Sequence, residues 1–464
     1  MPTSTPPRAL AVTIFAATIG VGAFLLFQVQ FILGKQILPW FGGVPAVWTT
    51  CMLFFQVLLL LGYGYAHLLS SRLTPPRQRN VHLGVLVLAA ALLLVHVAGW
   101  PSPLTPSDAW KPTADDVPAV AILGLLLVTI GLPFLVLSST GPLLQSWYAR
   151  CLPGTSPYRL YALSNLGSLL GLLSYPFVLE PLWPVTTQGW GWTAGFFVFA
   201  SGCAAAAVLV GRTADAAAKA PADHADHADG ADHADHADHA DPESSRPPTP
   251  AAKALWVLLA MTASVLLLAI TSQISLEVAV IPFLWMLPLA LYLLSFVLCF
   301  EYEGVYHRAV WIPLLLVGAG CTTAVLYLGV DAPMLVQLVV YLTTLLLACM
   351  VCHGELVRRK PVPRYLTGFY LWVSAGGAAG GVFTGVVAPA VFPDLWELPM
   401  ALVIACGLAI TLGLSEPSIR RRIRFRVAAG LGALYVGAVA VALVMHAADE
   451  LDDNLYVTRG FFGV

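Results

Sequence analysis

The sequence predicts an all-helical protein that crosses a membrane many times, and three observations lead to this fold class. Of the 464 residues, 58% are apolar and only 10% are charged, against about 25% charged residues in soluble domains. The mean hydropathy is +0.81. Apolar runs long enough to span a bilayer recur along the whole chain. A soluble enzyme or a nucleic-acid binder cannot hide so much apolar surface, so both classes are excluded.

Thirteen apolar runs have the length of a membrane span. Six lie in the first part of the chain, at about 9–34, 46–70, 80–99, 117–141, 157–179 and 190–211. Six more lie at about 252–272, 279–300, 308–328, 333–353, 363–390 and 399–415, and a thirteenth at about 425–446. Helix is the predicted structure, because a transmembrane barrel needs alternating strands of ~10 residues and the sequence shows none.

A polar stretch, 212–251, separates residues 1–211 from residues 252–416, and each flanking part holds six predicted spans. The stretch repeats Asp, His and Ala without any apolar face, so we expect a disordered linker. Two interpretations of its histidines stay open. The repeat is low-complexity sequence, or its imidazoles and carboxylates bind zinc, nickel or copper loosely. The candidate ligands are His224, His227, His233, His236 and His239.

The basic residues predict how the chain is oriented. Lys and Arg concentrate in the loops on the cytoplasmic side of membrane proteins. Here they gather between the second and third spans, the fourth and fifth, the tenth and eleventh, and the twelfth and thirteenth. All four loops lie on one side if the span count is right, and the opposite loops are mainly acidic. We therefore expect a cytoplasmic N-terminus and a cytoplasmic linker. Thirteen spans put the C-terminus outside and twelve put it inside.

The two parts of the chain share a pattern of small residues. Tyr161, Gly167 and Gly171 recur 209 residues later as Tyr370, Gly376 and Gly380. A parallel repeat of two six-helix halves is typical of major-facilitator transporters. Small residues also recur wherever membrane helices pack closely, so the pattern alone leaves duplication open. These glycines, together with Gly377, serve either as surfaces for movement between the halves or as static packing.

Three segments, 35–48, 271–300 and 353–371, resemble the bacterial family described as fused major-facilitator/spermidine synthase. The resemblance covers nearly the whole chain and implies a location in the bacterial inner membrane. It also implies a soluble aminopropyltransferase-like domain after the membrane part, of which residues 459–464 look like the opening. In that interpretation residues 417–464 hold a basic loop, a thirteenth helix and the start of that domain. Glu277 stands where the family is expected to carry Asp.

The resemblance does not carry an enzymatic activity over to this chain. The glycine-rich nucleotide loop and the acidic catalytic residues of such a domain have no counterpart in the sequence. We therefore assign no catalytic residue and no cofactor, and whether the chain belongs to an enzyme stays open. Cys349, Cys352 and His353 match the C-x-x-C-H pattern of haem attachment. They lie in an apolar helix predicted to end in the cytoplasm, so we do not expect haem.

Polar residues within predicted spans are the candidate solute-binding groups, since such groups are costly in a bilayer. Glu277, with the aromatic rings of Trp285 and Tyr292, could hold an amine by charge and cation–π contact. The alternative places Glu277 in a solvated outer loop. Gln28 and Gln56 line a polar cavity or bond neighbouring helices. Tyr161, Asn165 and Tyr370, in the repeated segments, complete the candidate set.

Three further residues are candidates for proton transfer or gating. His353 and Glu355 end the tenth span, and Arg159 opens the fifth. Histidine titrates near neutral pH, so a His-x-Glu pair could relay protons. The alternative is an interfacial ion-pair cluster with Arg358, Arg359 and Lys360 that fixes a loop.

The sequence thus supports three hypotheses about function. The first is a membrane transporter of a small solute, related to polyamines if the resemblance holds. The second is the membrane anchor of a spermidine synthase-like aminopropyltransferase, whose catalytic domain is absent from this sequence. The third is a metal-ion transporter with a histidine-rich loop. The expected partners are the lipid bilayer, a small-molecule solute and a spermidine synthase-like domain, and no nucleic acid.

Overall fold

The structure of the protein is a computed structural model that describes most of the chain. The described residues are 8–113, 116–152, 158–219, 247–277, 282–302, 304–362, 365–392, 394–415 and 424–453. Within them every one of the thirteen predicted apolar runs is helical. The fold-class prediction is confirmed: the protein is an all-helical, multi-pass membrane protein.

The helices follow the predicted order along the chain. The first set is α1 (Arg8–Phe41), α2 (Pro45–Arg72), α3 (Pro75–Val97), α4 (Pro118–Cys151), α5 (Tyr158–Ser174) and α7 (Val185–Lys219). The second set is α8 (Pro250–Glu277), α9 (Pro282–Glu301), α10 (Arg308–Leu328), α11 (Met334–Arg358), α12 (Leu366–Val382) and α14 (Glu397–Leu414), followed by α16 (Arg424–Asp453). Because α7 continues to Lys219, residues 212–219 of the predicted linker are helical.

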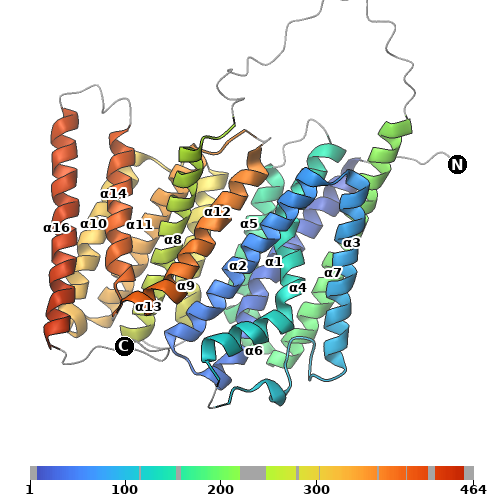
Figure 1. Ribbon diagram of the computed structural model, residues 1–464, viewed down its shortest axis with the longest axis horizontal. Helices are drawn as coiled ribbons and strands as arrows, with labels where there is room; N and C mark the ends of the chain where they lie inside the picture. The colour runs from blue at the N-terminus through green and yellow to red at the C-terminus, as the bar shows by residue number, and fades with distance from the viewer. Residues whose placement is uncertain are drawn as a thin grey trace, which may run out of the picture.

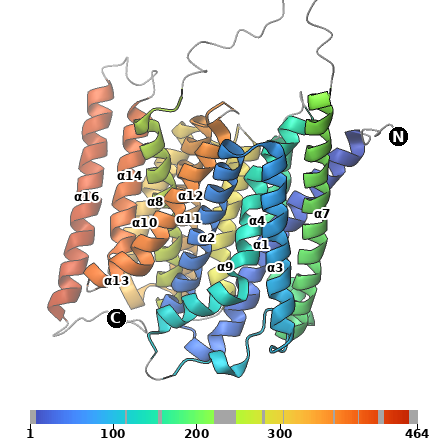
Figure 2. The same cartoon turned by 45° about the vertical axis from the view of Figure 1, so that its right-hand side comes forward.

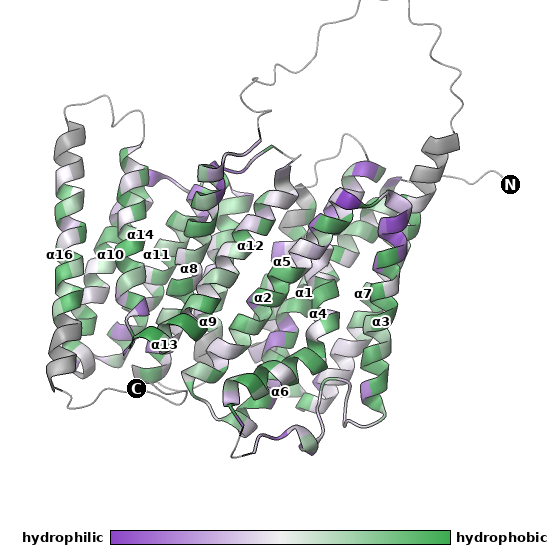
Figure 3. Ribbon diagram, in the orientation of Figure 1, coloured by the Kyte–Doolittle hydropathy of each residue, from purple (hydrophilic) through white to green (hydrophobic). Residues whose placement is uncertain are grey.

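Ten helices in the described ranges are long and apolar enough to cross a membrane. The remaining three are α5, which is 17 residues long, and α9 and α16, whose apolar stretches are Met286–Glu301 and Gly430–Met445. Figure 3 shows hydrophobic residues along most of each helix and hydrophilic residues gathered near the ends. This distribution is the one expected where the middle of the bundle faces lipid and its ends face water.

Prolines and glycines account for several helix boundaries. Pro45, Pro75 and Pro118 occupy the first turn of α2, α3 and α4, where a missing N–H costs nothing. Gly42 separates α1 from α2 with a φ of 83°, and Gly329 ends α10 with a φ of 50°. Such left-handed backbone is routine for glycine and costly for other residues.

The same helix pairings occur in both sets (Figures 1 and 2). Helix α1 packs against α5 as α8 packs against α12, α2 against α4 as α9 against α11, and α3 against α7 as α10 against α14. Contacts between the sets run from α2 to α12 and from α5 to α9. In both views α3 and α7 stand at one edge of the bundle and α16 stands at the other, beside α10 and α14.

The repeated glycines bring helix backbones together within each set. A Cβ on Gly167 would lie 2.6 Å from the carbonyl oxygen of Gly20 in α1, and one on Gly171 would collide with the carbonyl of Phe24. In the second set, a Cβ on Gly376 would collide with the carbonyl of Val257 in α8, and Gly380 repeats the approach one turn later. These four glycines therefore close the α1–α5 and α8–α12 contacts, which favours the static-packing alternative over surfaces for movement between sets.

Each set also contains one wide helical turn. The π-helical turn η2 consists of the five residues Tyr175–Leu179, which directly follow α5. The equivalent turn η5 consists of Phe383–Val387, which directly follow α12. The short helices α6 (Glu180–Leu182) and α13 (Ala388–Val391) follow, and each has a proline at its start. A proline has no N–H to give to the preceding turn, so the regular hydrogen-bond ladder loosens before it.

Candidate functional site

A cavity of about 220 Å³ lies between the two sets of helices. Its lining comes from α1, α2, α4 and α5 of the first set and from α8, α9 and α12 of the second. On α1, α2, α4, α8 and α12 the lining residues lie within stretches of spanning length. The cavity is therefore internal to the bundle and is shared by both sets.

The cavity wall is mostly apolar and aromatic, with neutral polar groups between the rings. The aromatic members are Phe27, Phe55, Tyr63, Phe134, Tyr292, Phe296 and Tyr370. The neutral polar members are Gln30, Gln56, Ser138, Thr140, Ser164, Asn165, Ser168 and Ser374. Among the described residues that line the cavity there is no Asp, Glu, Lys, Arg or His. Such a wall can offer hydrogen bonds and ring faces but no described ionic partner.

One hydrogen-bonded chain crosses between the sets beside this cavity. The Nε2 of Gln56 in α2 donates to the Oγ of Ser264 in α8 at 3.0 Å. Ser264 in turn donates to the carbonyl oxygen of Gly377 in α12 at 3.0 Å. Helix α12 comes so close that a Cβ on Gly381 would collide with the Gln56 amide. The seam between α2 and α12 is thus closed by the Gln56 amide, the Ser264 hydroxyl of the neighbouring α8, and the backbone of α12 at its glycines.

Four of the predicted solute-binding residues line the cavity, namely Gln56, Asn165, Tyr292 and Tyr370. Gln28 is buried in α1 but does not line it, whereas Gln30 on the same helix does. The side chains of Tyr161, Trp285, Glu277 and Arg159, and the five linker histidines, lie outside the described residues.

The backbone position of Glu277 is nevertheless defined, since it is the last residue of α8. The α8 residue in the cavity wall is Leu267, ten residues earlier. At 1.5 Å per residue, this separation is about 15 Å along the helix axis. The role predicted for the Glu277 carboxylate therefore stays a prediction.

His353 lies directly behind the cavity wall. The side chain is fully buried in α11, and its Nδ1 is 2.9 Å from the hydroxyl of Ser295. Its ring meets those of Tyr292 and Phe296 edge-on, with centroids 4.8 and 4.7 Å away. The Nε2 atom is buried and has no hydrogen-bond partner in the described part of the chain. Tyr292 and Phe296 face the cavity, so one layer of aromatic rings separates it from the imidazole.

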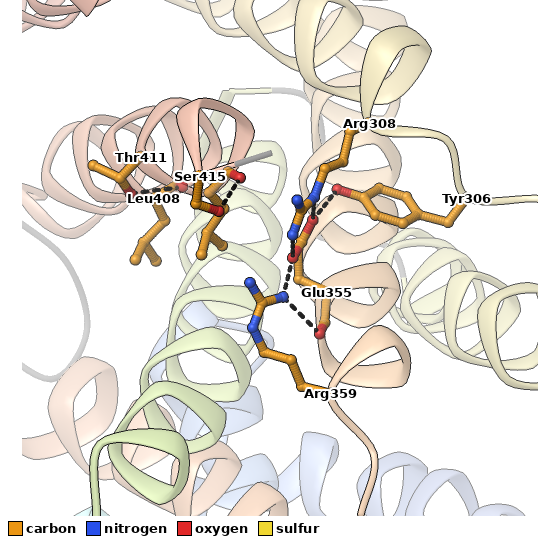
Figure 4. Close-up of polar contacts among 8 residues, drawn as sticks. Tyr306, Arg308, Glu355, Arg359, Leu408, Thr411 and Ser415 are labelled. Atoms are coloured by element: carbon orange, nitrogen blue, oxygen red, sulfur yellow. Dashed lines mark hydrogen bonds and ion pairs between the residues drawn. The ribbon is translucent and has the colours of Figure 1, made fainter. Parts of the chain in front are cut away.

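Glu355, two residues further along α11, belongs to an ionic cluster (Figure 4). Its fully buried carboxylate accepts bonds from Arg308 at 2.5 and 2.7 Å, from the Tyr306 hydroxyl at 2.9 Å, and from Arg359. Tyr306 lies between α9 and α10, where burial and the neighbouring Glu355 charge raise the pKa of its phenol. The cluster fixes this loop and the start of α10 to the last turn of α11. Of the basic residues named in the ion-pair alternative, Arg359 contacts Glu355, and Arg308 joins it from α10. The proton-transfer or gating role of His353, Glu355 and Arg159 stays a prediction.

The sequence analysis did not identify Tyr306 and Arg308 as the partners of Glu355. It also missed two polar contacts in the first set of helices. Lys35 near the end of α1 pairs with Glu180 of α6 at 2.7 Å. At the opposite face of the first set, Gln78 of α3 accepts bonds from Trp147 and Arg150 of α4. A lone charge or amide beside an apolar run is a signal that a partner exists, but it does not identify that partner.

No group of three or more His, Cys, Asp or Glu side chains is placed to hold a metal ion in the described part of the chain. The predicted Asp-His ligands fall outside that part. Cys349 and Cys352 are both buried within α11.

Fold and cavity together define the class of protein: a multi-pass helical membrane protein with an internal cavity between two sets of helices. No protein-family model matches the chain. No curated protein matches its sequence either.

Solved structures of transporters do match the fold of this protein. The major-facilitator proton:xylose symporter XylE is 11% identical over 88% of this chain and 95% of its own, with a TM-score of 0.49. A bacterial homologue of the human lysosomal transporter Spinster is 15% identical over 96% of both chains, with a TM-score of 0.46. The nucleoside transporter NupG is 10% identical over 93% of this chain and 99% of its own, with a TM-score of 0.42. All three TM-scores lie below 0.5. None of these three proteins is a fused spermidine synthase.

Proposed function

We propose that the protein is a carrier of the major-facilitator type, which moves a small solute across the membrane through the cavity between its two sets of helices. The observation that carries this proposal is the shared lining, to which α1, α2, α4 and α5 contribute from one set and α8, α9 and α12 from the other. Transporters built from two repeats bind their solutes near the bilayer midplane at the interface between the repeats.

The repeated helix pairings support a division into two six-helix halves, residues 1–211 and 252–416. Equivalent contacts join α1 to α5 and α8 to α12, and the wide turns η2 and η5 follow at matching places. In this proposal the halves rock against each other along the α2–α12 and α5–α9 seams, so that the cavity opens to one face at a time.

The proposed orientation places the basic ends of the helices in the cytoplasm of a bacterium, with the protein in the inner membrane. It rests on the Lys and Arg distribution described above. Gln56, Asn165, Tyr292 and Tyr370 are the proposed solute contacts, because their side chains line the cavity. A polyamine solute and an anchoring role both derive from the family resemblance. The described lining offers a polyamine no carboxylate, so we do not favour that class.

Access to the cavity from both faces tests the carrier proposal. We would place a cysteine at Ser168, a lining residue of α5, and expose it to a membrane-impermeant thiol reagent. The assay compares right-side-out with inverted membrane vesicles, and the parent protein reports labelling of the native cysteines. A carrier visits both open states, so the Ser168→Cys variant should be labelled in both kinds of vesicle.

A channel would also be labelled from both faces, and a second measurement separates the two. Proteoliposomes that contain the purified protein should hold a potassium gradient if the protein is a carrier, because no open path crosses the bilayer. Labelling of Ser168→Cys from one face alone, or from neither, would contradict the carrier proposal.

A further inference from the structure

Three polar atoms in the cavity wall are buried and have no hydrogen-bond partner among the residues that the structure describes. They are the Nδ2 of Asn165 in α5, the Oε1 of Gln56 in α2 and the Oγ of Ser374 in α12. Buried polar groups in proteins are almost always satisfied, and each unsatisfied one costs about 1–3 kcal/mol. Three such atoms around one cavity are therefore a sign that something else completes their hydrogen bonds.

The three atoms differ in chemistry and in origin. An amide nitrogen can only donate, an amide oxygen can only accept, and a hydroxyl can do both. Asn165 and Gln56 belong to the first set of helices and Ser374 to the second. A molecule that satisfies all three must carry both donor and acceptor groups, and it must bridge the two sets.

The rest of the wall determines what charge that molecule can carry. Removing an ion from water costs several kcal/mol unless an opposite charge or a dense set of hydrogen bonds replaces the solvent. The described lining contains no Asp, Glu, Lys, Arg or His, and a ring layer separates His353 from the space. Among its described residues the wall therefore offers no ionic partner to offset the desolvation of a charged solute.

The aromatic members of the wall supply the remaining contact surface. Tyr292 and Phe296 come from α9 of the second set, and Tyr63 from α2 of the first. Aromatic side chains bind apolar faces and ring systems through large contact areas. A solute with hydrogen-bonding groups at its rim and an apolar face fits this combination of amides, hydroxyl and rings.

We infer that the cavity binds an uncharged, hydrogen-bonding solute of hydroxylated or amide character, held between Asn165 and Gln56 on one side and Ser374 on the other. This inference rests on the proposed carrier function and names its substrate class. It differs from the polyamine class that the family resemblance suggested, because a polyamine is cationic at neutral pH.

Ligand stabilisation of the purified full-length protein tests the substrate class directly. A ligand that binds only the folded protein raises the temperature of unfolding, and the rise grows with the logarithm of the ratio between ligand concentration and Kd. The uncharged probes are myo-inositol, D-glucose, uridine and nicotinamide, and the charged probes are putrescine, spermidine and succinate. We expect stabilisation by at least one uncharged probe at millimolar concentration and none by the charged probes.

Two variants with matched controls tie the response to the cavity. Asn165→Ala and Ser374→Ala should each weaken binding of the active probe roughly tenfold, the effect of one lost hydrogen bond to a buried partner. Asn80→Ala and Ser201→Ala are the controls, since Asn80 and Ser201 are exposed and do not line the cavity. The control variants should respond as the parent protein does.

Some results would overturn the inference. Stabilisation by putrescine, spermidine or succinate that Asn165→Ala weakens would show that the site takes a charged solute. If no uncharged probe stabilises the protein, the substrate class is rejected. It is also rejected if an uncharged probe stabilises Asn165→Ala and Ser374→Ala as much as it stabilises the parent. If Ser168→Cys is labelled from both faces in these cases, the carrier proposal survives and only the solute class fails.

Discussion

Arg308 holds Glu355 by two parallel contacts, from Nε to Oε1 at 2.5 Å and from Nη2 to Oε2 at 2.7 Å. The guanidinium is 13% exposed and the carboxylate is fully buried, so water screens the pair little. The two residues join the first turn of α10 to the last turn of α11. Such a two-point pair fixes the angle between partners as well as their separation.

Glu355→Gln should destabilise the folded protein strongly. The substitution removes the buried negative charge that pairs with both Arg308 and Arg359. Breaking a buried ion pair on one side typically costs about 3–5 kcal/mol. The change is measured as the loss of unfolding temperature of the purified protein in detergent.

Asp108→Asn serves as the control, because Asp108 pairs with Lys111 on the surface with its side chain 85% exposed. Exposed pairs contribute at most about 1 kcal/mol, so this variant should unfold close to the parent. Equal, small effects of the two substitutions would show that the Glu355 cluster does not stabilise the fold.

Gly171→Ala should also destabilise the protein, by about 1–3 kcal/mol, as overpacked sites do. Its new Cβ would collide with the backbone of α1 at Phe24, which cannot turn away as a side chain can. Gly84→Ala in α3 is the control, since nothing lies within 4 Å of its added Cβ. This exposed helical site should be neutral or stabilised by up to ~1 kcal/mol. The measurement compares the unfolding temperatures of the two variants with that of the parent. An unchanged unfolding temperature for Gly171→Ala would disprove the close contact with α1.

The effect of Tyr306→Phe should depend on pH. Burial and the Glu355 charge raise the pKa of Tyr306 in the folded protein. The phenol therefore ionises first in the unfolded chain, near its ordinary pKa of about 10. Its stabilising bond to Glu355 is fully present below that pH and is lost as the pH rises.

Unfolding of parent and variant at about pH 8 and about pH 11 measures this dependence. The stability advantage of the parent should be largest at the lower pH and should shrink at the higher one. Tyr302→Phe removes a phenol from an exposed neighbour and controls for general effects of alkali. An advantage that stays constant would count against the Tyr306–Glu355 bond.

The proposed orientation predicts a labelling pattern in whole cells. Lys111→Cys, beside η1 (Asp108–Trp110), should react with an impermeant maleimide in intact cells. Arg77→Cys, at the start of α3, should react only after the membrane is permeabilised. The parent chain reports the background from native cysteines. The opposite pattern would place the basic loops outside and reverse the orientation.

The helices could be predicted because hydrophobic length is a local property of the sequence. Runs such as 80–99 and 308–328 became α3 and α10 with boundaries close to those expected. The π-helical turns η2 and η5 could not be predicted. They depend on how Pro181 and Pro389 interrupt a hydrogen-bond ladder that the surrounding packing otherwise keeps helical.

The candidate site was predictable as a set of residue types but not as a geometry. Gln56, Asn165, Tyr292 and Tyr370 attracted attention because polar groups in spans need partners, and all four line the cavity. Ser264 and Ser374 went unnoticed, since serine is common in membrane helices and hydrogen-bonds readily to its own backbone. Arg308 was missed as the partner of Glu355 because the pairing requires α10 to pack on α11, which no local pattern encodes.

The bare backbone contacts at Gly171 and Gly376 have a mechanical consequence. Where no side chain separates two helices, no rotamer change can absorb a shift between them. Helix α5 is therefore held against α1, and α12 against α8, by contacts that leave no side chain to adjust. In the proposed rocking motion, adjustment would therefore fall to the α2–α12 seam, where the contact is made by a side chain, the Gln56 amide.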